Sequence, residues 1–115
     1  MITNDMQTYL IIIAFIAYFV WRYLRFQKIK KILPSLLERG ATVIDVRTVN
    51  EFNSGAHPIS INIPLTDLNR RIKDLDKNKP VIVCCASGAR SGVAQRILKQ
   101  NGFVEVINAG PWTNI

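Results

Sequence analysis

A cysteine followed by small residues and an arginine is the part of this sequence best suited to covalent chemistry. Cys85 comes directly before a loop made of Ala86, Ser87, Gly88, Ala89, Arg90 and Ser91. Because these side chains are mostly small, the backbone N–H groups of the loop can point inward and surround an anion. The charge of Arg90 and the start of a following helix both stabilise a thiolate. We therefore expect Cys85 to be a nucleophile of lowered pKa rather than a core cysteine.

The elements around the cysteine place it where ligands usually bind. Pro80 opens a short β-branched run over 81–83, which indicates a buried parallel strand. Beyond the loop, apolar residues recur at helical spacing from 93 to 98, and Asn101-Gly102 indicates the helix end. Cys85 thus lies between the carboxyl end of a strand and the start of a helix, which is the ligand-binding edge of an open α/β sheet.

The rest of the chain predicts a small α/β fold. Thr48 and Glu51 have the spacing of a capping box that opens a short helix. Alternating strands and helices imply a parallel sheet flanked by helices. We expect further strands over 41–46, 60–63 and 103–107, a short helix over 34–39 that ends at Gly40, and an amphipathic helix over 65–75.

An apolar segment precedes this domain. Residues 9–21 carry no charge, and their flanks extend the segment to about 7–24, enough for one transmembrane helix. No basic residue precedes it, and no small-residue cleavage site follows, which argues against a cleaved signal peptide. The basic residues follow it, at Arg22, Arg25, Lys28, Lys30 and Lys31. The positive-inside rule therefore predicts a single-pass protein of the cell (inner or plasma) membrane, with its N-terminus outside and its domain cytoplasmic.

This interpretation divides the chain into residues 1–33, the anchor with a basic juxtamembrane connector, and residues 34–115, the catalytic domain. It also accounts for the densest basic cluster of a chain whose net charge is +7. No basic motif interleaved with aromatics indicates nucleic-acid binding. Two adjacent cysteines give no disulfide framework, and the sequence has no metal-ligand spacing and calls for no cofactor. Cys84 is expected as a buried neighbour, with a resolving thiol as the alternative.

Three motifs resemble the single-domain rhodaneses, the thiosulfate sulfurtransferase-like family. Residues 85–91 resemble the Cys-x-x-Gly-x-Arg-Ser active-site loop. Residues 45–55 resemble the Asp-Val-Arg-x-x-x-Glu-Phe/Tyr-x-x-Gly signature, and residues 62–64 resemble the Asn-Ile-Pro that follows it. The resemblance extends from about Leu36 to Trp112. One departure is His57, which is shifted by one place from the usual Gly-His-Ile and is expected to be a loop residue.

The resemblance implies a sulfurtransferase, and with the predicted transmembrane segment it would be a membrane-anchored one. Cys85 would take the sulfane sulfur of a donor as a persulfide, held by the loop amides and Arg90, and a thiol or cyanide would remove it. Thiosulfate, glutathione persulfide and a protein persulfide are all suitable donors. Besides donor and acceptor, the bilayer is the expected partner. Ser91 would cap the following helix or bond within the loop.

Two other functions stay open at this point. A phosphatase or arsenate reductase also uses a cysteine cradle, but with five residues between cysteine and arginine, and this loop has four. A catalytically silent docking module would keep the fold without the chemistry. Asp45 and Arg47 either border the site or form a structural ion pair, and Trp112 either covers the pocket mouth or completes the core.

Overall fold

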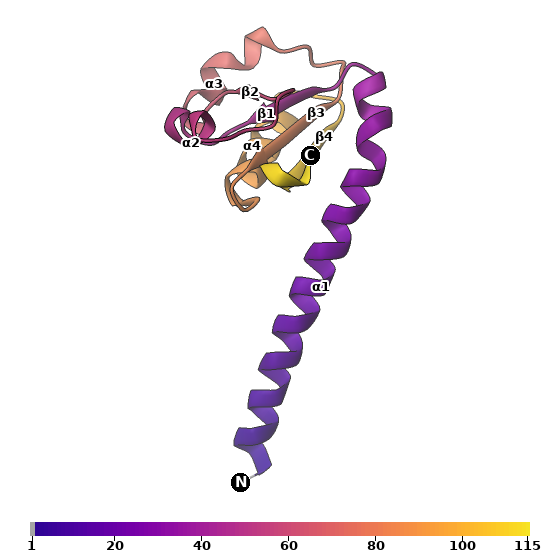
Figure 1. Ribbon diagram of the computed structural model, residues 1–115, viewed down its shortest axis with the longest axis vertical. Helices are drawn as coiled ribbons and strands as arrows, with labels where there is room; N and C mark the ends of the chain where they lie inside the picture. Colours follow the sequence, from indigo (N-terminus) through magenta and orange to yellow (C-terminus); the bar gives the residue numbers. More distant parts are fainter. Residues whose placement is uncertain (1) are drawn as a thin grey trace.

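The computed structural model describes residues 2–115 and contains one four-stranded sheet (Figure 1). All neighbouring strands are parallel, and their order is β2-β1-β3-β4. This confirms the α/β fold with a parallel sheet. The strands are β1 (Thr42–Asp45), β2 (Ile61–Asn62), β3 (Val81–Cys85) and β4 (Val106–Pro111).

Every residue of β3 is buried, as the continuous apolar run predicts. Because successive strand residues point to opposite faces of a sheet, the two cysteines separate. Cys84 packs with the core cluster on one face, and Cys85 packs with the cluster on the other. The adjacency of the two thiols in sequence therefore does not bring them together in the fold.

The α-helices that follow β1 are short except for the last one. They are α2 (Val49–Asn53), α3 (Leu68–Arg71) and α4 (Ala89–Gln100). The capping box of Thr48 and Glu51 is present at the start of α2. The single amphipathic helix expected over 65–75 is wrong, because α3 is flanked by 3₁₀ turns at Leu65–Asp67 and Ile72–Asp74. The apolar residues of this segment nevertheless pack in the core or against it. The 3₁₀ turns are tighter than an α-helix and occur in such short pieces.

The other face of the sheet is covered by the second half of α1 (Ile2–Glu38), a 37-residue helix that extends far beyond the sheet (Figure 1). Ile29 and Leu36 are buried there, with Phe26 and Leu33 packed beside them. The separate helix expected over 34–39 is therefore the end of α1, which also includes residues 22–33. Pro34 lies inside α1. We attribute its tolerance to this packing, since an interior proline costs a helix about 3 kcal/mol.

The first half of α1 makes no such contacts. It is long and apolar enough to cross a membrane, and the side chains of its apolar window are exposed. At 1.5 Å per residue the helix is about 55 Å long, so the apolar half can extend away from the sheet while the other half packs on it.

The last strand begins later than the sequence suggests. The expected strand 103–107 is observed as β4, Val106–Pro111, while Phe103 is a buried residue of the preceding turn. The pairing of β3 with β4 shifts after Val83, so that Asn108 pairs with Val83 but Gly110 pairs with Cys84. This bulge leaves Ala109 as the extra residue and redirects the end of β4 beside Cys85.

Candidate active site

Cys85 is fully buried at the carboxyl end of β3, directly below the loop that leads into α4. The amide of Gly88 donates to its Sγ at 2.9 Å, and the Sγ lies 3.3 Å from the hydroxyl oxygen of Ser91. Gly88 has φ +104, a conformation that favours glycine and lets its amide turn toward the sulfur. The loop therefore surrounds the thiol with hydrogen-bond donors.

These donors decide the pKa of Cys85. Burial by itself raises the pKa of a thiol. Hydrogen bonds from the Ser91 hydroxyl and from the amides of Ser91, Gly88 and Ser87 outweigh that burial, so the pKa of Cys85 lies below its ordinary value. The direction agrees with the expected thiolate, and the hydrogen bonds of the loop are the main cause that lowers the pKa of Cys85.

Ser91 also belongs to a second hydrogen bond. It is fully buried, and its hydroxyl donates to the Oδ1 of Asn108 at 2.6 Å. Asn108 in turn donates from Nδ2 to the Gly88 carbonyl at 3.1 Å, and its Oδ1 also accepts from the Gly110 amide at 2.9 Å. Asn108 thus joins Ser91, the loop and the bulge of β4. No sequence motif marks this residue, because only the bulge brings it to the loop.

Arg90 pairs with Glu51 rather than standing free in the loop. Its two terminal nitrogens donate to the two carboxylate oxygens of Glu51, at 2.6 and 2.9 Å. The hydrogen bonds from Arg90 and from Thr48 lower the pKa of Glu51 to about 2. Because this carboxylate is ionised at neutral pH, the pair ties α2 to the start of α4. The sequence predicts Glu51 only as a capping residue and as part of the motif over residues 45–55. It does not predict the pair with Arg90.

Asp45, the last residue of β1, forms a buried ion pair with Arg47. The Nη2 of Arg47 donates to Asp45 Oδ2 at 2.7 Å and to the Gly55 carbonyl at 2.7 Å. The guanidinium lies 4.9 Å from the centroid of the Trp112 ring, and Trp112 packs half-buried with the cluster under α1. Arg47 therefore contacts both Asp45 and Trp112, and Trp112 packs against the core cluster on that face.

Two other predicted residues lie away from the nucleophile's contacts. Cys84 is fully buried on the opposite face, where burial raises the pKa of its thiol to about 12. His57 accepts a hydrogen bond from the Ile59 amide at its Nδ1, which is a contact within its own loop.

The helix α1 reaches the loop, which sequence reasoning missed. Arg22 donates to the Ser87 carbonyl, and the ring of Phe26 lies against Gly88 and Gly110. From the apolar run, the sequence predicts that Arg22 and Phe26 belong to an anchor and its connector, with no contact to the loop. Their position beside the loop follows from the docking of α1 on the sheet.

The site has the parts of a covalent transferase: a thiol of lowered pKa in a ring of amide donors, at the edge of a parallel sheet. Comparison with known proteins agrees. A profile described as "Rhodanese-like domain" matches residues 30–110. The chain is 37% identical over 109 residues to YqhL of Bacillus subtilis (strain 168), covering 91% of this chain and 86% of YqhL. This chain belongs to the rhodanese-like family.

Two further relatives carry names that describe an activity. The chain is 41% identical over 69 residues to the thiosulfate sulfurtransferase PspE of Escherichia coli (strain K12), covering 58% of this chain and 66% of PspE. The structure of a "rhodanese with anions from E. coli" superposes with a TM-score of 0.59 at 41% identity, covering 65% of this chain and 91% of the other. One relative at this level of similarity is thus named a thiosulfate sulfurtransferase, which supports sulfurtransferase activity at the level of the family.

Proposed function

We propose that the chain is a sulfurtransferase that carries sulfane sulfur as a persulfide on Cys85. The observation that carries the proposal is the buried Cys85 Sγ with the Gly88 amide 2.9 Å away and the Ser91 hydroxyl oxygen 3.3 Å away. A sulfur anion at this position is held by donors that are already oriented, so its charge is stabilised without reorganisation of the loop.

The chemistry balances without a cofactor. The Cys85 thiolate attacks the sulfane sulfur of thiosulfate, the S–S bond of the donor breaks, and sulfite leaves with the bonding electron pair. The product is a persulfide whose terminal sulfur takes the place of the attacking thiolate in the loop. A thiolate or cyanide acceptor then attacks that terminal sulfur and releases the Cys85 thiolate. Glutathione persulfide or a protein persulfide would supply sulfur in the same way.

The remaining loop residues have supporting roles in this proposal. Ala86, Ser87 and Ala89 contribute backbone rather than side-chain chemistry. Arg90 acts through its pair with Glu51, which fixes the first turn of α4 and keeps a cation near the persulfide. Asp45, Arg47 and Trp112 hold the neighbouring edge of the sheet.

We also propose that the apolar half of α1 anchors the protein in the cell membrane, with the domain on the cytoplasmic side. The exposed apolar helix and the basic residues at 22–31 support this arrangement. A reducing cytoplasm also suits a thiol that must stay free.

Intact mass spectrometry of the full chain in an uncharged detergent tests the function. The protein is incubated with thiosulfate, and wild type is compared with Cys85→Ser and Cys84→Ser. We expect wild type and Cys84→Ser to gain one sulfur atom that cyanide removes, and Cys85→Ser to gain none. A folded wild-type protein that gains no sulfur from thiosulfate or glutathione persulfide would contradict the proposal and favour a docking module.

A further inference from the structure

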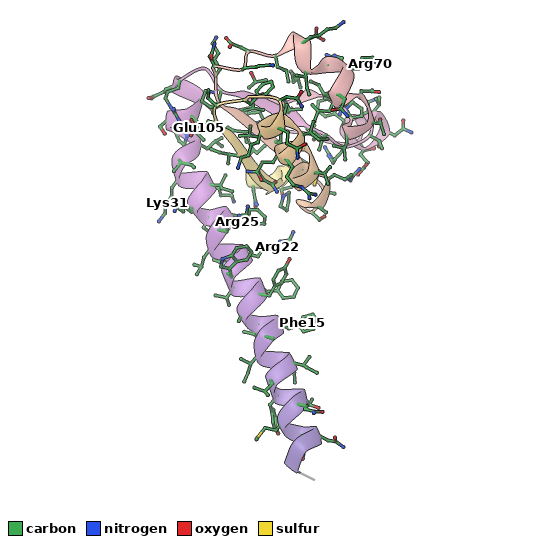
Figure 2. The ribbon with its side chains drawn as sticks, turned by 180° about the vertical axis from the view of Figure 1, so that it is seen from behind. Phe15, Arg22, Arg25, Lys31, Arg70 and Glu105 are labelled. Atoms are coloured by element: carbon green, nitrogen blue, oxygen red, sulfur yellow. The ribbon has the colours of Figure 1, made fainter. Side chains whose placement is uncertain are left out.

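A small pocket lies between α1 and the active-site loop. Its volume is about 200 Å³, and its walls include Trp21, Arg22, Arg25 and Phe26 of α1 and Ser87 and Gly88 of the loop. Figure 2 shows Arg22 and Arg25 where α1 meets the folded domain, with Phe15 farther along the helix away from it. The pocket therefore exists only because the N-terminal helix docks beside the loop.

The pocket is positively charged and has no acidic partner. Within residues 2–115, neither Arg22 nor Arg25 lies in an ion pair with a carboxylate, and the lining contains no acidic residue. Both guanidinium groups stack on aromatic rings, Arg22 at 5.5 Å from the Phe26 centroid and Arg25 at 5.3 Å from the Trp21 centroid. Stacking uses the faces of the guanidinium and leaves N–H donors on its edge for a ligand.

Size and charge together restrict the ligand. The volume is below the roughly 300–1,000 Å³ of pockets for drug-sized molecules, so a nucleotide is too large. Two adjacent guanidinium groups repel a cation, whereas their fork of N–H donors matches the oxygen atoms of sulfonate, sulfate and phosphate groups.

We propose that this pocket is a binding site for a tetrahedral oxyanion held by Arg22 and Arg25. The oxyanion is either a free ion such as thiosulfate or the phosphate of an anionic lipid headgroup, since Tyr18 and Trp21 also belong to the pocket and end the apolar run. The inference goes beyond sulfur transfer and does not depend on it, because it concerns binding.

The position of the site gives binding a direct effect on the loop. Arg22 already holds the Ser87 carbonyl, and Phe26 covers Gly88, whose amide donates to Cys85. An anion between the two arginines neutralises their mutual repulsion and stabilises the docked position of α1.

Sulfate is the first probe, because it is an oxyanion with no sulfane sulfur to transfer. Full-length wild type in an uncharged detergent is titrated with potassium sulfate at ionic strength held constant with potassium chloride, and tryptophan fluorescence is recorded because Trp21 lines the pocket. We expect a saturable change. The control Arg70→Gln removes an exposed arginine elsewhere (Figure 2) and should bind like wild type.

Arginine variants test which residues bind. Arg22→Gln/Arg25→Gln should weaken sulfate binding by about a hundredfold, since it removes two charge-assisted contacts that are each worth about tenfold. Arg25→Gln alone leaves the Arg22 bond to the loop intact, and Arg25→Lys keeps the charge and should retain part of the affinity. Circular dichroism melts show whether each variant is folded.

Lipid identifies the source of the oxyanion. Phosphatidylglycerol is added to the micelles in place of sulfate, with phosphatidylcholine, a zwitterionic lipid of no net charge, as the comparison. Competition of phosphatidylglycerol with sulfate assigns the site to a lipid headgroup, and sulfate or thiosulfate binding without such competition assigns it to a free ion. The proposal is overturned if neither ligand gives a saturable signal, or if folded arginine variants bind both as wild type does.

Discussion

The hydroxyl of Ser91 can donate one hydrogen bond, and two neighbouring atoms can accept it. Asn108 Oδ1 lies 2.6 Å from its oxygen, and Cys85 Sγ lies 3.3 Å from it. When Cys85 is a thiol, its S–H can donate to Ser91 while Ser91 donates to Asn108. When Cys85 is a thiolate, Ser91 donates its hydrogen bond to the sulfur instead, because a charged acceptor binds a donor more strongly than a neutral amide oxygen does. Ionisation of the nucleophile is thereby coupled to the competition between Asn108 and the sulfur.

Two substitutions should move the reactivity of Cys85 in opposite directions. Ser91→Ala removes a donor to the thiolate, so the pKa of Cys85 rises and its alkylation by iodoacetamide at pH 7 slows by about tenfold. Asn108→Ala removes the competing acceptor, so the pKa falls and the pH profile of alkylation moves to lower pH. The measurement uses a Cys84→Ser background so that only Cys85 reacts.

The same pair of variants separates this role from a structural one. Asn108→Ala also leaves the Gly88 carbonyl and the Gly110 amide without a partner, which costs about 1–3 kcal/mol of stability. Urea unfolding records that loss separately from the pH profile. Displacement of both pH profiles in the same direction would show that the two residues only support the fold.

At the scale of elements, α1 packs against β4 with little room at one glycine, Gly110. Gly110 has φ +76, and a Cβ at this position would collide with the ring of Phe26. Gly102 also has a positive φ, of +87, but a Cβ there would meet no atom within 4 Å. Both glycines therefore have a positive φ that strains other residues, but only at Gly110 would an added side chain also meet a neighbouring residue.

Gly110→Ala should cost more stability than Gly102→Ala. Both lose the freedom of glycine at positive φ, at about 1 kcal/mol, and only Gly110→Ala must also displace α1, which adds about 1–3 kcal/mol of overpacking. Urea unfolding measures both. Phe26→Ala should remove the extra cost of Gly110→Ala in a double-mutant cycle. Equal losses for the two glycine variants would show that α1 does not press on β4.

At the scale of the whole molecule, α1 belongs to two environments. Its second half is part of the folded domain, with Ile29 and Leu36 buried on the sheet. Its first half is exposed and apolar. The sequence-based division at residue 33/34 would cut between these buried residues.

Truncation tests where the domain begins. A chain of residues 34–115 lacks Phe26, Ile29 and Leu33 and uncovers an apolar face of the sheet, so we expect it to aggregate or to unfold at lower urea than residues 25–115. Burial of these side chains is worth about 1.5–3 kcal/mol each. Size-exclusion chromatography and urea unfolding compare the two. A monomeric 34–115 chain as stable as 25–115 would place the boundary where the sequence suggested.

The orientation in the membrane is a separate prediction. Fused at its C-terminus to green fluorescent protein, the full chain should fluoresce at the cell membrane, and a C-terminal alkaline phosphatase fusion should be inactive, because the basic residues at 22–31 keep the domain inside. An active phosphatase fusion would show the opposite topology. Fluorescence spread through the cytoplasm would contradict the proposal that α1 anchors the protein in the membrane.

Local patterns in the sequence determined much of this protein. The wholly apolar β-branched run specified β3, Thr48 and Glu51 specified the start of α2, and the small residues after Cys85 specified the donor loop. These features could be predicted because they depend on neighbours within a few residues: turn chemistry, capping and strand alternation. The surroundings of Cys85 belong to the same group, since the residues that bind its sulfur follow it directly.

Only the tertiary structure decided what reaches the loop from far along the chain. Glu51 pairs with Arg90, Asn108 meets Ser91 through a bulge, and Arg22 meets Ser87 because α1 docks on the sheet. Packing also joined the segment with Pro34 into one helix and broke the expected helix at 65–75. Such contacts depend on which faces are buried against each other. Local propensity carries no information about that choice, so the chemistry could be inferred from the sequence and its surroundings could not.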